Sequence, residues 1–154
     1  SSDLGRKTFP NGRAFLCIET VSGYRSDTRS LPLEQREYEP VSLVVIDVSF
    51  ISLTMVLPPV MQFLRPGAVV IALVKPQFEV GKGQVGRGGI VRDEAQRQAV
   101  LQRILACAEG LGLTQKATLD SPIRGKKGNL EFLSIFEFNE NVYAKKESAL
   151  RGGV

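Results

Sequence analysis

The sequence has 154 residues, which is enough for one domain with its own hydrophobic core. Its hydrophobic content of 43%, charged content of 23% and formal net charge of +4 are ordinary for a globular protein. The mild positive charge suits a polyanionic partner without requiring one. Histidine is absent from the sequence, which excludes Ser-His-Asp triads, Cys-His pairs and most zinc sites. Proton transfer therefore has to use Lys, Asp, Glu, Tyr or Cys.

The first part of the sequence predicts two strands separated by polar segments. Residues 1–12 are polar and contain a turn signal, whereas residues 13–20 predict a short strand. Residues 22–40 are rich in Ser, Arg, Glu and Pro, which is typical of a loop. The apolar run at 43–46 contains β-branched residues and ends at Asp47, a pattern typical of a strand buried on both faces.

A helix and a second buried strand are expected next. Residues 49–67 have a partly helical pattern, in which the Pro58–Pro59 pair starts or kinks the second half. The Pro66–Gly67 pair is expected to end this helix. Residues 68–74 are apolar throughout and predict the second buried strand.

The last third predicts one long helix and two strands. Asp93 is a favourable N-cap for a helix over residues 94–112. Residues 114–121 predict a strand and residues 122–129 a basic turn. The alternating pattern of residues 131–138 indicates an edge or antiparallel strand.

Strands that alternate with helices favour an α/β domain with a largely parallel sheet over residues 1–138. The charged segment at 139–154 is expected to be a disordered tail. In open parallel sheets, binding sites lie at the carboxyl ends of the strands. Asp47 and Lys75 both take that position, because each directly follows a predicted buried strand.

The glycine-rich loop contains Gly81, Gly83 and Gly86 in the spacing of a dinucleotide-binding fingerprint. Such a fingerprint requires a strand directly before the glycines and a helix that opens on the last one. Six residues separate the predicted strand from Gly81, and another six separate Gly86 from Asp93, the N-cap of the predicted helix. The loop is therefore expected to lie beside a site, where Lys82 and Arg87 contact phosphates or remain solvated.

Asp47, Lys75 and Glu131 form the polar set of greatest interest. Each residue taken alone is an ordinary polar residue at a strand end, and Glu131 opens the last predicted strand. Together they could converge on one crevice. A lysine between two carboxylates can orient and activate a hydroxyl nucleophile.

Four segments resemble successive blocks of the FtsJ-like ribose methyltransferase family, in its haemolysin A or TlyA branch. They read IDVSFISL, ALVKPQFE, GKGQVGRGGIVRD and SPIRGKKGNLEFL, in the family's order, and cover about residues 40–138. The resemblance implies a Rossmann-like methyltransferase sheet. It also implies transfer of a methyl group from S-adenosylmethionine to a ribose 2′-hydroxyl of ribosomal RNA, without a metal. The branch pairs this domain with an N-terminal S4 RNA-binding domain.

The family's Lys-Asp-Lys-Glu tetrad is matched at three positions. The resemblance implies that Lys75 meets the ribose hydroxyl, that Asp47 and Glu131 support it, and that Asp47 also faces the methyl donor. Asp3 resembles, more weakly, the acidic residue near the donor's ribose. The first tetrad lysine and the glycine-rich donor loop have no counterpart in the sequence. We therefore expect a sheet that is truncated at its N-terminal strands. We do not expect these 154 residues alone to bind S-adenosylmethionine tightly.

Basic loops on both sides of this site predict contact with RNA phosphates. The expected partner is ribosomal RNA or a ribosomal subunit, in the cytoplasm or in an organelle with bacterial-type ribosomes. No membrane contact is expected. Self-association is expected through an exposed edge at a central strand of the sheet. The predicted RNA-binding residues are Lys82, Arg87, Arg124, Lys126 and Lys127.

Two other functions remain open from the sequence. One is an inactive remnant that binds RNA or the ribosome without catalysis. The other takes the haemolysin name literally as membrane lysis, which the absence of an amphipathic membrane-seeking segment disfavours.

Overall fold

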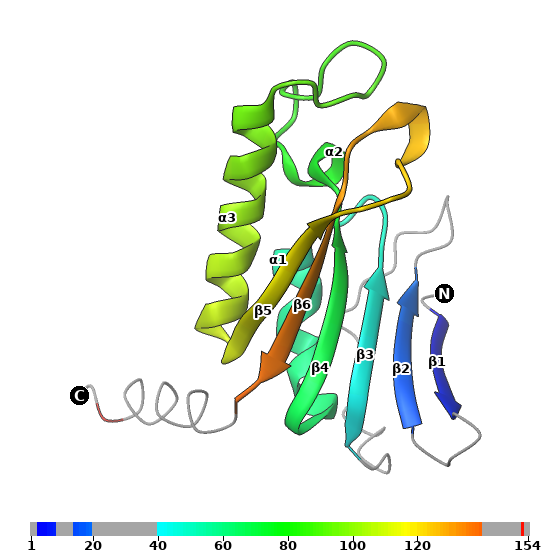
Figure 1. Ribbon diagram of the computed structural model, residues 1–154, viewed down its shortest axis with the longest axis vertical. Coiled ribbons are helices and arrows are strands. Elements are labelled where there is room, and N and C mark those ends of the chain that lie inside the picture. The colour runs from blue at the N-terminus through cyan, green and yellow to red at the C-terminus, as the bar shows by residue number, and fades with distance from the viewer. Residues whose placement is uncertain (1–2, 9–13, 20–39, 140–151, 153–154) are drawn as a thin grey trace.

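The computed structural model describes residues 3–8, 14–19, 40–139 and 152, and these form one six-stranded sheet with helices (Figure 1). The strand order is β1-β2-β3-β4-β6-β5. The strands are β1 (Asp3–Thr8), β2 (Ala14–Glu19), β3 (Val41–Asp47), β4 (Leu64–Val74), β5 (Leu113–Asp120) and β6 (Phe132–Phe138). The helices are α1 (Leu53–Val60), α2 (Pro76–Glu79) and α3 (Glu94–Gly110), with 3-10 turns at Met61–Phe63 and Lys126–Gly128.

The sheet is mixed, whereas the sequence predicted a largely parallel one. β2, β3 and β4 run parallel, while β1 pairs with β2, β4 with β6 and β5 with β6 in antiparallel fashion. The connection from β5 to β6 contains no crossover helix, and a parallel neighbour needs such a crossover. β6 therefore returns antiparallel, as its alternating sequence allowed, but it lies inside the sheet and β5 forms the edge.

Two features of the strands differ from the sequence analysis. The segment at 3–8 is a strand, whereas the sequence showed only polar residues and a turn signal there. The Pro66–Gly67 pair lies inside β4, where the register of Val41 with Leu64 changes to that of Leu43 with Val69. The extra residues of β4 form a bulge, in which the missing proline N–H and the positive φ of Gly67 are tolerated.

The edges of the described sheet are β1 and β5 rather than a central strand. β3 and β4 each pair with a strand on both sides. Self-association through an edge stays a prediction, and the candidate edges are now these two outer strands. The loop predicted at 22–40 and the tail predicted at 139–154 lie, apart from residues 40, 139 and 152, outside the described residues.

The two longer helices begin at side-chain caps. Ser52 caps α1 by accepting a hydrogen bond from the N–H of Thr54, and Asp93 caps α3 by accepting one from Ala95. The cap at Asp93 confirms the sequence prediction. α1 includes both prolines of the Pro58–Pro59 pair and then tightens into the 3-10 turn.

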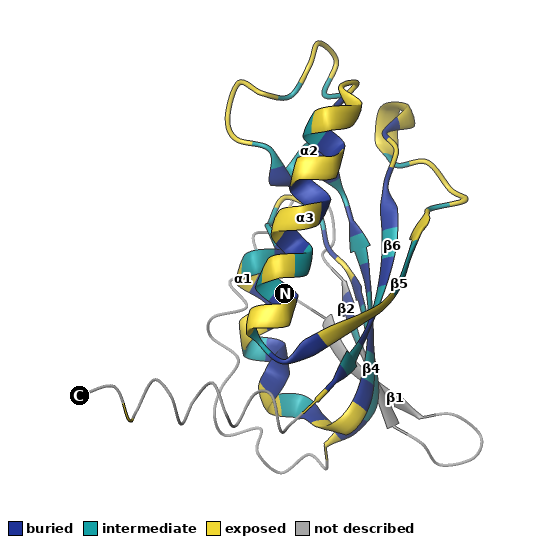
Figure 2. Cartoon of the chain, turned by 60° about the vertical axis from the view of Figure 1, so that its left-hand side comes forward, coloured by how far each residue is buried: buried dark blue, intermediate teal, exposed yellow. Residues whose placement is uncertain are grey.

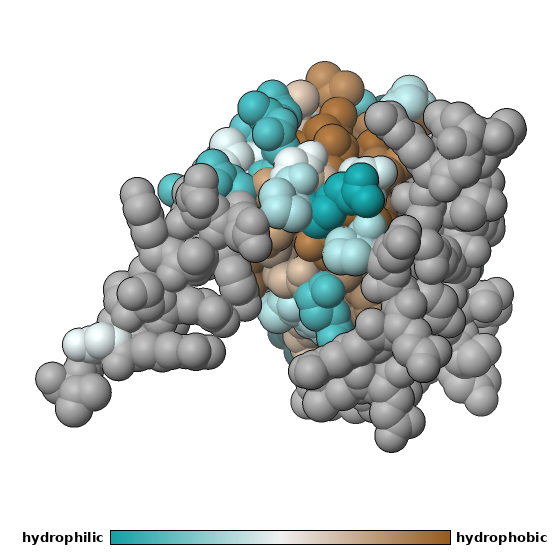
Figure 3. All heavy atoms as spheres, turned by 90° about the horizontal axis from the view of Figure 1, so that it is seen from below, coloured by the Kyte–Doolittle hydropathy of each residue, from teal (hydrophilic) through white to brown (hydrophobic). Residues whose placement is uncertain are grey.

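The helices cover one face of the sheet (Figure 2). β4 from Ala68 onwards and the whole of β6 alternate between buried and half-buried residues. Half-buried apolar residues such as Val45 and Ile71 occupy the other face, and hydrophobic residues reach the surface when the molecule is seen from below (Figure 3). Within the described residues, none of the helices is long and apolar enough to cross a bilayer. The core towards the helices includes Val44, Ile46, Val56, Leu57, Val70, Val74, Ile104 and Phe136.

Candidate functional site

Asp47 and Lys75 meet at the carboxyl ends of β3 and β4, as their positions after two parallel strands predicted. The Nζ atom of Lys75 lies 2.6 Å from Oδ1 of Asp47 and donates a hydrogen bond of 3.4 Å to Oγ of Ser49. The lysine side chain is 13% exposed and the aspartate side chain 50% exposed. The amine is therefore held inside the site, and the carboxylate faces the opening.

Glu131 lies at the same end of the sheet, because it directly precedes β6, which runs antiparallel to β4. Phe132 pairs with Val74 across the antiparallel strands β6 and β4, so the residue before Phe132 lies level with Lys75. The carboxylate of Glu131 is buried and accepts a hydrogen bond of 2.8 Å from Nε2 of Gln77. Among the described contacts, Lys75 thus pairs with one carboxylate and shares a pocket with the other.

The pocket at this end of the sheet has a volume of about 290 Å³. It combines an amine, a carboxylate and an amide with two aromatic rings, so it offers groups both for a sugar hydroxyl and for an apolar surface. Its lining residues are Ser49, Phe50, Lys75, Gln77, Phe78, Gly125, Lys126 and Glu131.

Gln77 and Gly125 hold Glu131 in place, and the sequence did not single out either residue. A Cβ atom at Gly125 would lie 2.7 Å from Cδ of Glu131, closer than Cβ atoms approach, and a tight 3.1 Å from Nε2 of Gln77. The Oε1 atom of Gln77 is buried and has no hydrogen-bond partner among the described residues. An unpaired buried acceptor of this kind costs about 1–3 kcal/mol, so it is expected where a ligand completes the site.

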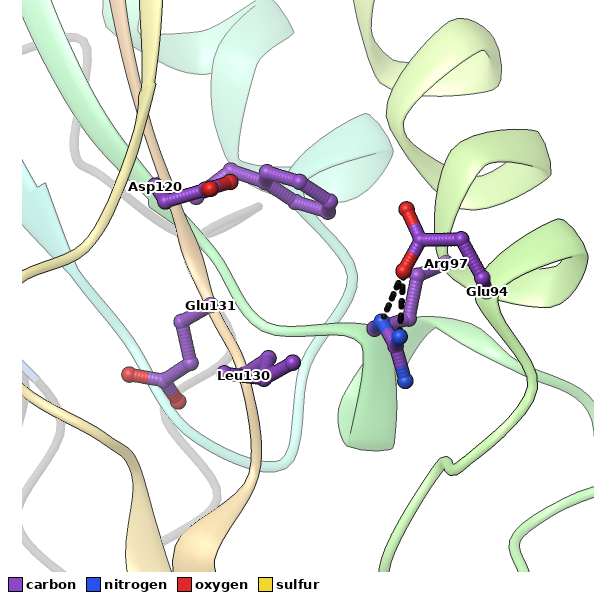
Figure 4. A pocket seen from close by; sticks show the side chains of 6 residues that line it. Glu94, Arg97, Asp120, Leu130 and Glu131 are labelled. Atoms are coloured by element: carbon purple, nitrogen blue, oxygen red, sulfur yellow. Dashed lines mark hydrogen bonds and ion pairs between the residues drawn. The ribbon is translucent and has the colours of Figure 1, made fainter.

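A second, smaller pocket of about 80 Å³ lies on the other side of Glu131 (Figure 4). Here Glu94 pairs with the buried guanidinium of Arg97, and the carboxylate of Glu131 points away from this pair. Hydrogen bonds from Gln98 and Arg97 lower the pKa of Glu94 below its usual value. Its lining has the carboxylates of Glu94, Asp120 and Glu131 against one guanidinium, which is already paired with Glu94. The larger pocket, which contains the amine of Lys75, is therefore the better candidate for chemistry.

Asn129 joins the glycine-rich loop to the basic turn. The residue is 3% exposed, and its side chain donates hydrogen bonds to the carbonyls of Gly89 and Lys126 and accepts one from the N–H of Val91. These contacts place the two basic loops side by side at the end of the sheet that carries the site. The sequence offered only an asparagine in a turn, which is an ordinary turn residue.

The predicted RNA-binding residues lie on these two joined loops. All five are exposed, and Lys126 also lines the pocket of Lys75. A Cβ atom at Gly89 would lie 3.2 Å from Nζ of Lys127, so the second loop reaches across to the first. The five cations are Lys82, Arg87, Arg124, Lys126 and Lys127.

The glycine-rich loop does not open a helix. The N–H of Gly86 donates a hydrogen bond to the carbonyl of Ile90, and a Cβ atom at Gly86 would lie 2.6 Å from that oxygen. Helix α3 begins only at Glu94. This glycine is thus explained by a tight turn inside the loop, and the geometry differs from that of a dinucleotide-binding fingerprint.

Asp3, the weakly predicted site residue, lies at the same end of the sheet as Asp47. Its backbone pairs with Glu19, and Glu19 pairs with Asp47, so three acidic residues follow one row across β1, β2 and β3. Glu19 was missed, because the strand was predicted to run one residue further, to 20, whereas β2 ends at Glu19. Among the described residues, no three side chains of His, Cys, Asp or Glu gather where they could hold a metal ion.

The sequence matches the FtsJ-like methyltransferase family over residues 3–138. It is 46% identical over 92 residues to the 16S/23S rRNA (cytidine-2′-O)-methyltransferase TlyA of Mycobacterium tuberculosis, covering 60% of this chain and 34% of that protein. It is 39% identical over 95 residues to Hemolysin A of Brachyspira hyodysenteriae, covering 62% of this chain and 40% of that protein. The chain therefore spans only about a third to two fifths of the length of these curated relatives.

Two solved structures share the fold. A candidate haemolysin of Lactococcus lactis is 38% identical with a TM-score of 0.69, covering 79% of this chain and 64% of that chain. A candidate haemolysin of Streptococcus thermophilus is 34% identical with a TM-score of 0.68, covering 83% of this chain and 50% of that chain. The likeness covers about four fifths of this chain, and the fold is an α/β, Rossmann-like methyltransferase fold. From its sequence match and its structure, the chain belongs to the FtsJ-like methyltransferase family.

Proposed function

We propose that the chain is the acceptor-binding part of an S-adenosylmethionine-dependent 2′-O-methyltransferase that acts on ribosomal RNA. The observation that supports this most directly is the amine of Lys75, 2.6 Å from Asp47 and in one pocket with Glu131. TlyA, with which it shares 46% identity over 92 residues, carries this activity in its name.

The chemistry that the site can perform is orientation of a hydroxyl nucleophile. S-adenosylmethionine supplies, when bound, a methyl group that is open to attack by an oxygen. Lys75 donates a hydrogen bond to the acceptor hydroxyl and stabilises the negative charge that its oxygen gains as the proton passes to a carboxylate of the site or to water. Asp47 and Glu131 keep the amine and the sugar in position from two sides.

The acidic row at the end of β1, β2 and β3 is the part of the chain that fits the donor. Carboxylates suit both the ribose hydroxyls and the positive charge of a sulfonium, and the Asp47 side chain is half-exposed. We assign Asp47 to this role, with Asp3 and Glu19 in the same row by strand register.

The two joined basic loops are proposed to bind the RNA phosphates beside the site. Their five exposed cations supply affinity that depends on salt but carries no sequence information. The corresponding partner is ribosomal RNA or a ribosomal subunit, in the cytoplasm or in an organelle with bacterial-type ribosomes.

The same loops also support a second candidate, an RNA-binding protein without catalysis. In that case RNA binding survives the loss of Lys75, and the chain gains no stability from the methyl donor. Titration calorimetry with S-adenosylmethionine separates the two functions, because saturable binding supports an enzyme and its absence at millimolar donor supports the alternative.

Replacement of Lys75 tests the proposed reaction. With labelled S-adenosylmethionine and isolated ribosomal subunits, we expect Lys75→Ala to lower the rate of methyl transfer by about 10²–10⁴-fold, because the group that orients and polarises the hydroxyl is lost. Lys116→Ala is the matched control, since Lys116 is an exposed lysine on β5 that pairs with Glu137. Undiminished transfer by Lys75→Ala, in a form of the protein that transfers the methyl group, contradicts the proposal.

A further inference from the structure

We infer that Gln77 is a positioning residue for the acceptor sugar and that it acts through Glu131. Its Nε2 atom donates a hydrogen bond of 2.8 Å to Oε2 of Glu131, and both side chains line the pocket that contains Lys75. Within the described part of the chain, the other carboxylate oxygen, Oε1 of Glu131, accepts no hydrogen bond. Gln77 therefore fixes one oxygen of the carboxylate and leaves the other to accept a hydrogen bond from a hydroxyl group.

The short helix α2 places the amide of Gln77 close to the amine of Lys75. Lys75 is the N-cap of α2 and Gln77 follows two residues later, so a single turn carries both groups. Glu79 anchors the end of that turn, because its carboxylate accepts hydrogen bonds from the hydroxyl of Ser52 and the N–H of Leu53. A donor on an anchored turn keeps a fixed position, which the orientation of a reacting group requires.

The unpaired oxygen of Gln77 indicates what sets the orientation of its amide. This Oε1 atom is buried without a partner among the described residues, which is unfavourable for a hydrogen-bond acceptor. Rotation of the amide would bring the oxygen against the carboxylate of Glu131, where two acceptors repel each other. The orientation therefore follows from the negative charge of Glu131, whereas a glutamine that served only the fold would have both ends of its amide paired.

Glu131 is better placed than Asp47 to accept a hydrogen bond from the acceptor hydroxyl. Asp47 already pairs with Lys75 at 2.6 Å. The carboxylate of Glu131 points away from the pair of Glu94 and Arg97 (Figure 4) and lines the larger pocket. A 2′-hydroxyl can then accept a hydrogen bond from Lys75 and donate one to Glu131, so the pocket distinguishes ribose from deoxyribose.

This role of Gln77 rests on the proposed function, because it names the group of the substrate that the site recognises. Methyl transfer depends on the amine of Lys75, whereas recognition of the sugar depends on the bond from Gln77 to Glu131. The two can fail separately, so the experiment measures binding and not methyl transfer.

The test compares two unstructured ten-nucleotide strands of equal charge, an RNA and the corresponding DNA with uracil bases. We expect the parent chain to bind the RNA about tenfold more tightly, because one hydrogen bond to a charged group is lost with the 2′-hydroxyl. Gln77→Met is expected to bind the two strands within about twofold of each other. Its salt dependence should equal that of the parent, because no charge changes.

Gln77→Glu tests whether the donor on residue 77 is what matters. Two carboxyl groups this close resist a second negative charge, so at about pH 5.5 the pair retains one proton. The protonated carboxyl group then donates to Glu131 as the amide does, and the preference for RNA should be that of the parent. At about pH 8 the shared proton is lost, the two groups repel each other, and the preference should fall to that of Gln77→Met.

The parent is measured at both pH values as the reference. Histidine, which changes charge in this interval, is absent from the sequence, and the variants leave the neighbouring charges in place. The charged residues that line the pockets on the two sides of Glu131 are Lys75, Lys126, Glu94, Arg97 and Asp120.

Gln98→Met is the matched control, because it removes the same kind of contact outside the pocket. Nε2 of Gln98 donates a hydrogen bond of 2.9 Å to Glu94 on the exposed side of α3, and this variant should keep the full preference for RNA. The urea midpoint of Gln77→Met should stay near that of the parent, since the change removes an unpaired buried oxygen together with the hydrogen bond.

A preference for RNA that persists in Gln77→Met, or that does not depend on pH in Gln77→Glu, overturns the role of Gln77. A parent chain that binds both strands equally also overturns it, and each of these results leaves the Lys75 proposal standing. Methyl transfer that persists in Lys75→Ala overturns the proposed reaction but not the sugar preference. A parent chain that binds neither strand overturns both proposals.

Discussion

Gly125 leaves room for the carboxylate that completes the site. Its φ of −68° is one that any residue adopts, so a side chain here acts through contact rather than through backbone strain. Since a Cβ atom would approach within 2.7 Å of Cδ of Glu131, Gly125→Ala has to displace that carboxylate from Gln77. The displaced group is the end of a flexible side chain, so the fold should accommodate the change.

We therefore expect Gly125→Ala to lower the rate of methyl transfer by about tenfold or more while the free energy of unfolding changes by under about 1 kcal/mol. Gly110→Ala is the matched control, because a Cβ atom there meets open space and its φ is ordinary. Rate measurements and urea denaturation of both variants decide the matter. A Gly125→Ala variant with the parent's rate would show that the position of Glu131 is unimportant.

Cys107 is a half-buried thiol on α3 that should be unreactive in the folded chain. Burial, with the nearby charge of Glu79 as the smaller cause, raises the pKa of the Cys107 thiol above its usual value. The folded state thus holds the thiol proton more tightly than the unfolded state. The stability that this provides is complete below the unfolded thiol's pKa and is lost as the pH rises through the folded thiol's pKa.

At about pH 8.5, close to the pKa of a free thiol, we expect alkylation of Cys107 to be several-fold slower in the native chain than in concentrated urea. Mass spectrometry of the peptide that contains Cys107 measures this separately from Cys17. In Cys107→Ala, the alkaline loss of stability should be smaller. Equal alkylation rates in both states would contradict the expectation.

At the scale of elements, α1 is anchored to the rest of the fold by the carboxylate of Glu79. This buried group accepts hydrogen bonds from the N–H of Leu53 and the hydroxyl of Ser52, and it pairs with Arg103 of α3. Glu79 thus satisfies the amino-terminal end of α1 and joins three helices, because it lies itself at the end of α2.

We expect Glu79→Ala to lower the free energy of unfolding by about 2 kcal/mol or more, since it leaves buried donors without an acceptor. Asp93→Ala removes an exposed helix cap and should cost only about 1 kcal/mol. Urea denaturation of the two variants gives the order. If the loss of the exposed cap proved the more costly, the assigned role of Glu79 would be wrong.

At the scale of the whole molecule, the sheet has two unlike faces. Val44 is completely buried under the helices, whereas its neighbour Val45 lies half-buried on the face without a helix in the described part of the chain. Val44→Thr places a hydroxyl in the core and should cost about 1–3 kcal/mol. Val45→Thr, the matched change one residue on, should cost clearly less, and urea denaturation compares them. Equal costs would mean that the second face is covered in solution.

Much of the site follows from local patterns. Runs of β-branched residues that end in Asp47 and Lys75 specify two buried parallel strands, and parallel strands place their carboxyl ends together. Asp93 predicted the start of α3 because capping depends on only a few neighbouring residues. The position of Glu131 opposite Lys75 was expected from the family resemblance, and the roles of all three residues stay predictions.

The sequence by itself determined the elements that depend on short-range preferences, together with the edge at which the acid and the amine meet. Only the tertiary structure decided the antiparallel direction of β6, the bond of Gln77 to Glu131, the joining of the loops by Asn129 and the exposed ring of Phe50. The physical reason is range: propensities and caps act over a few residues, whereas these contacts depend on strand register between residues dozens of positions apart.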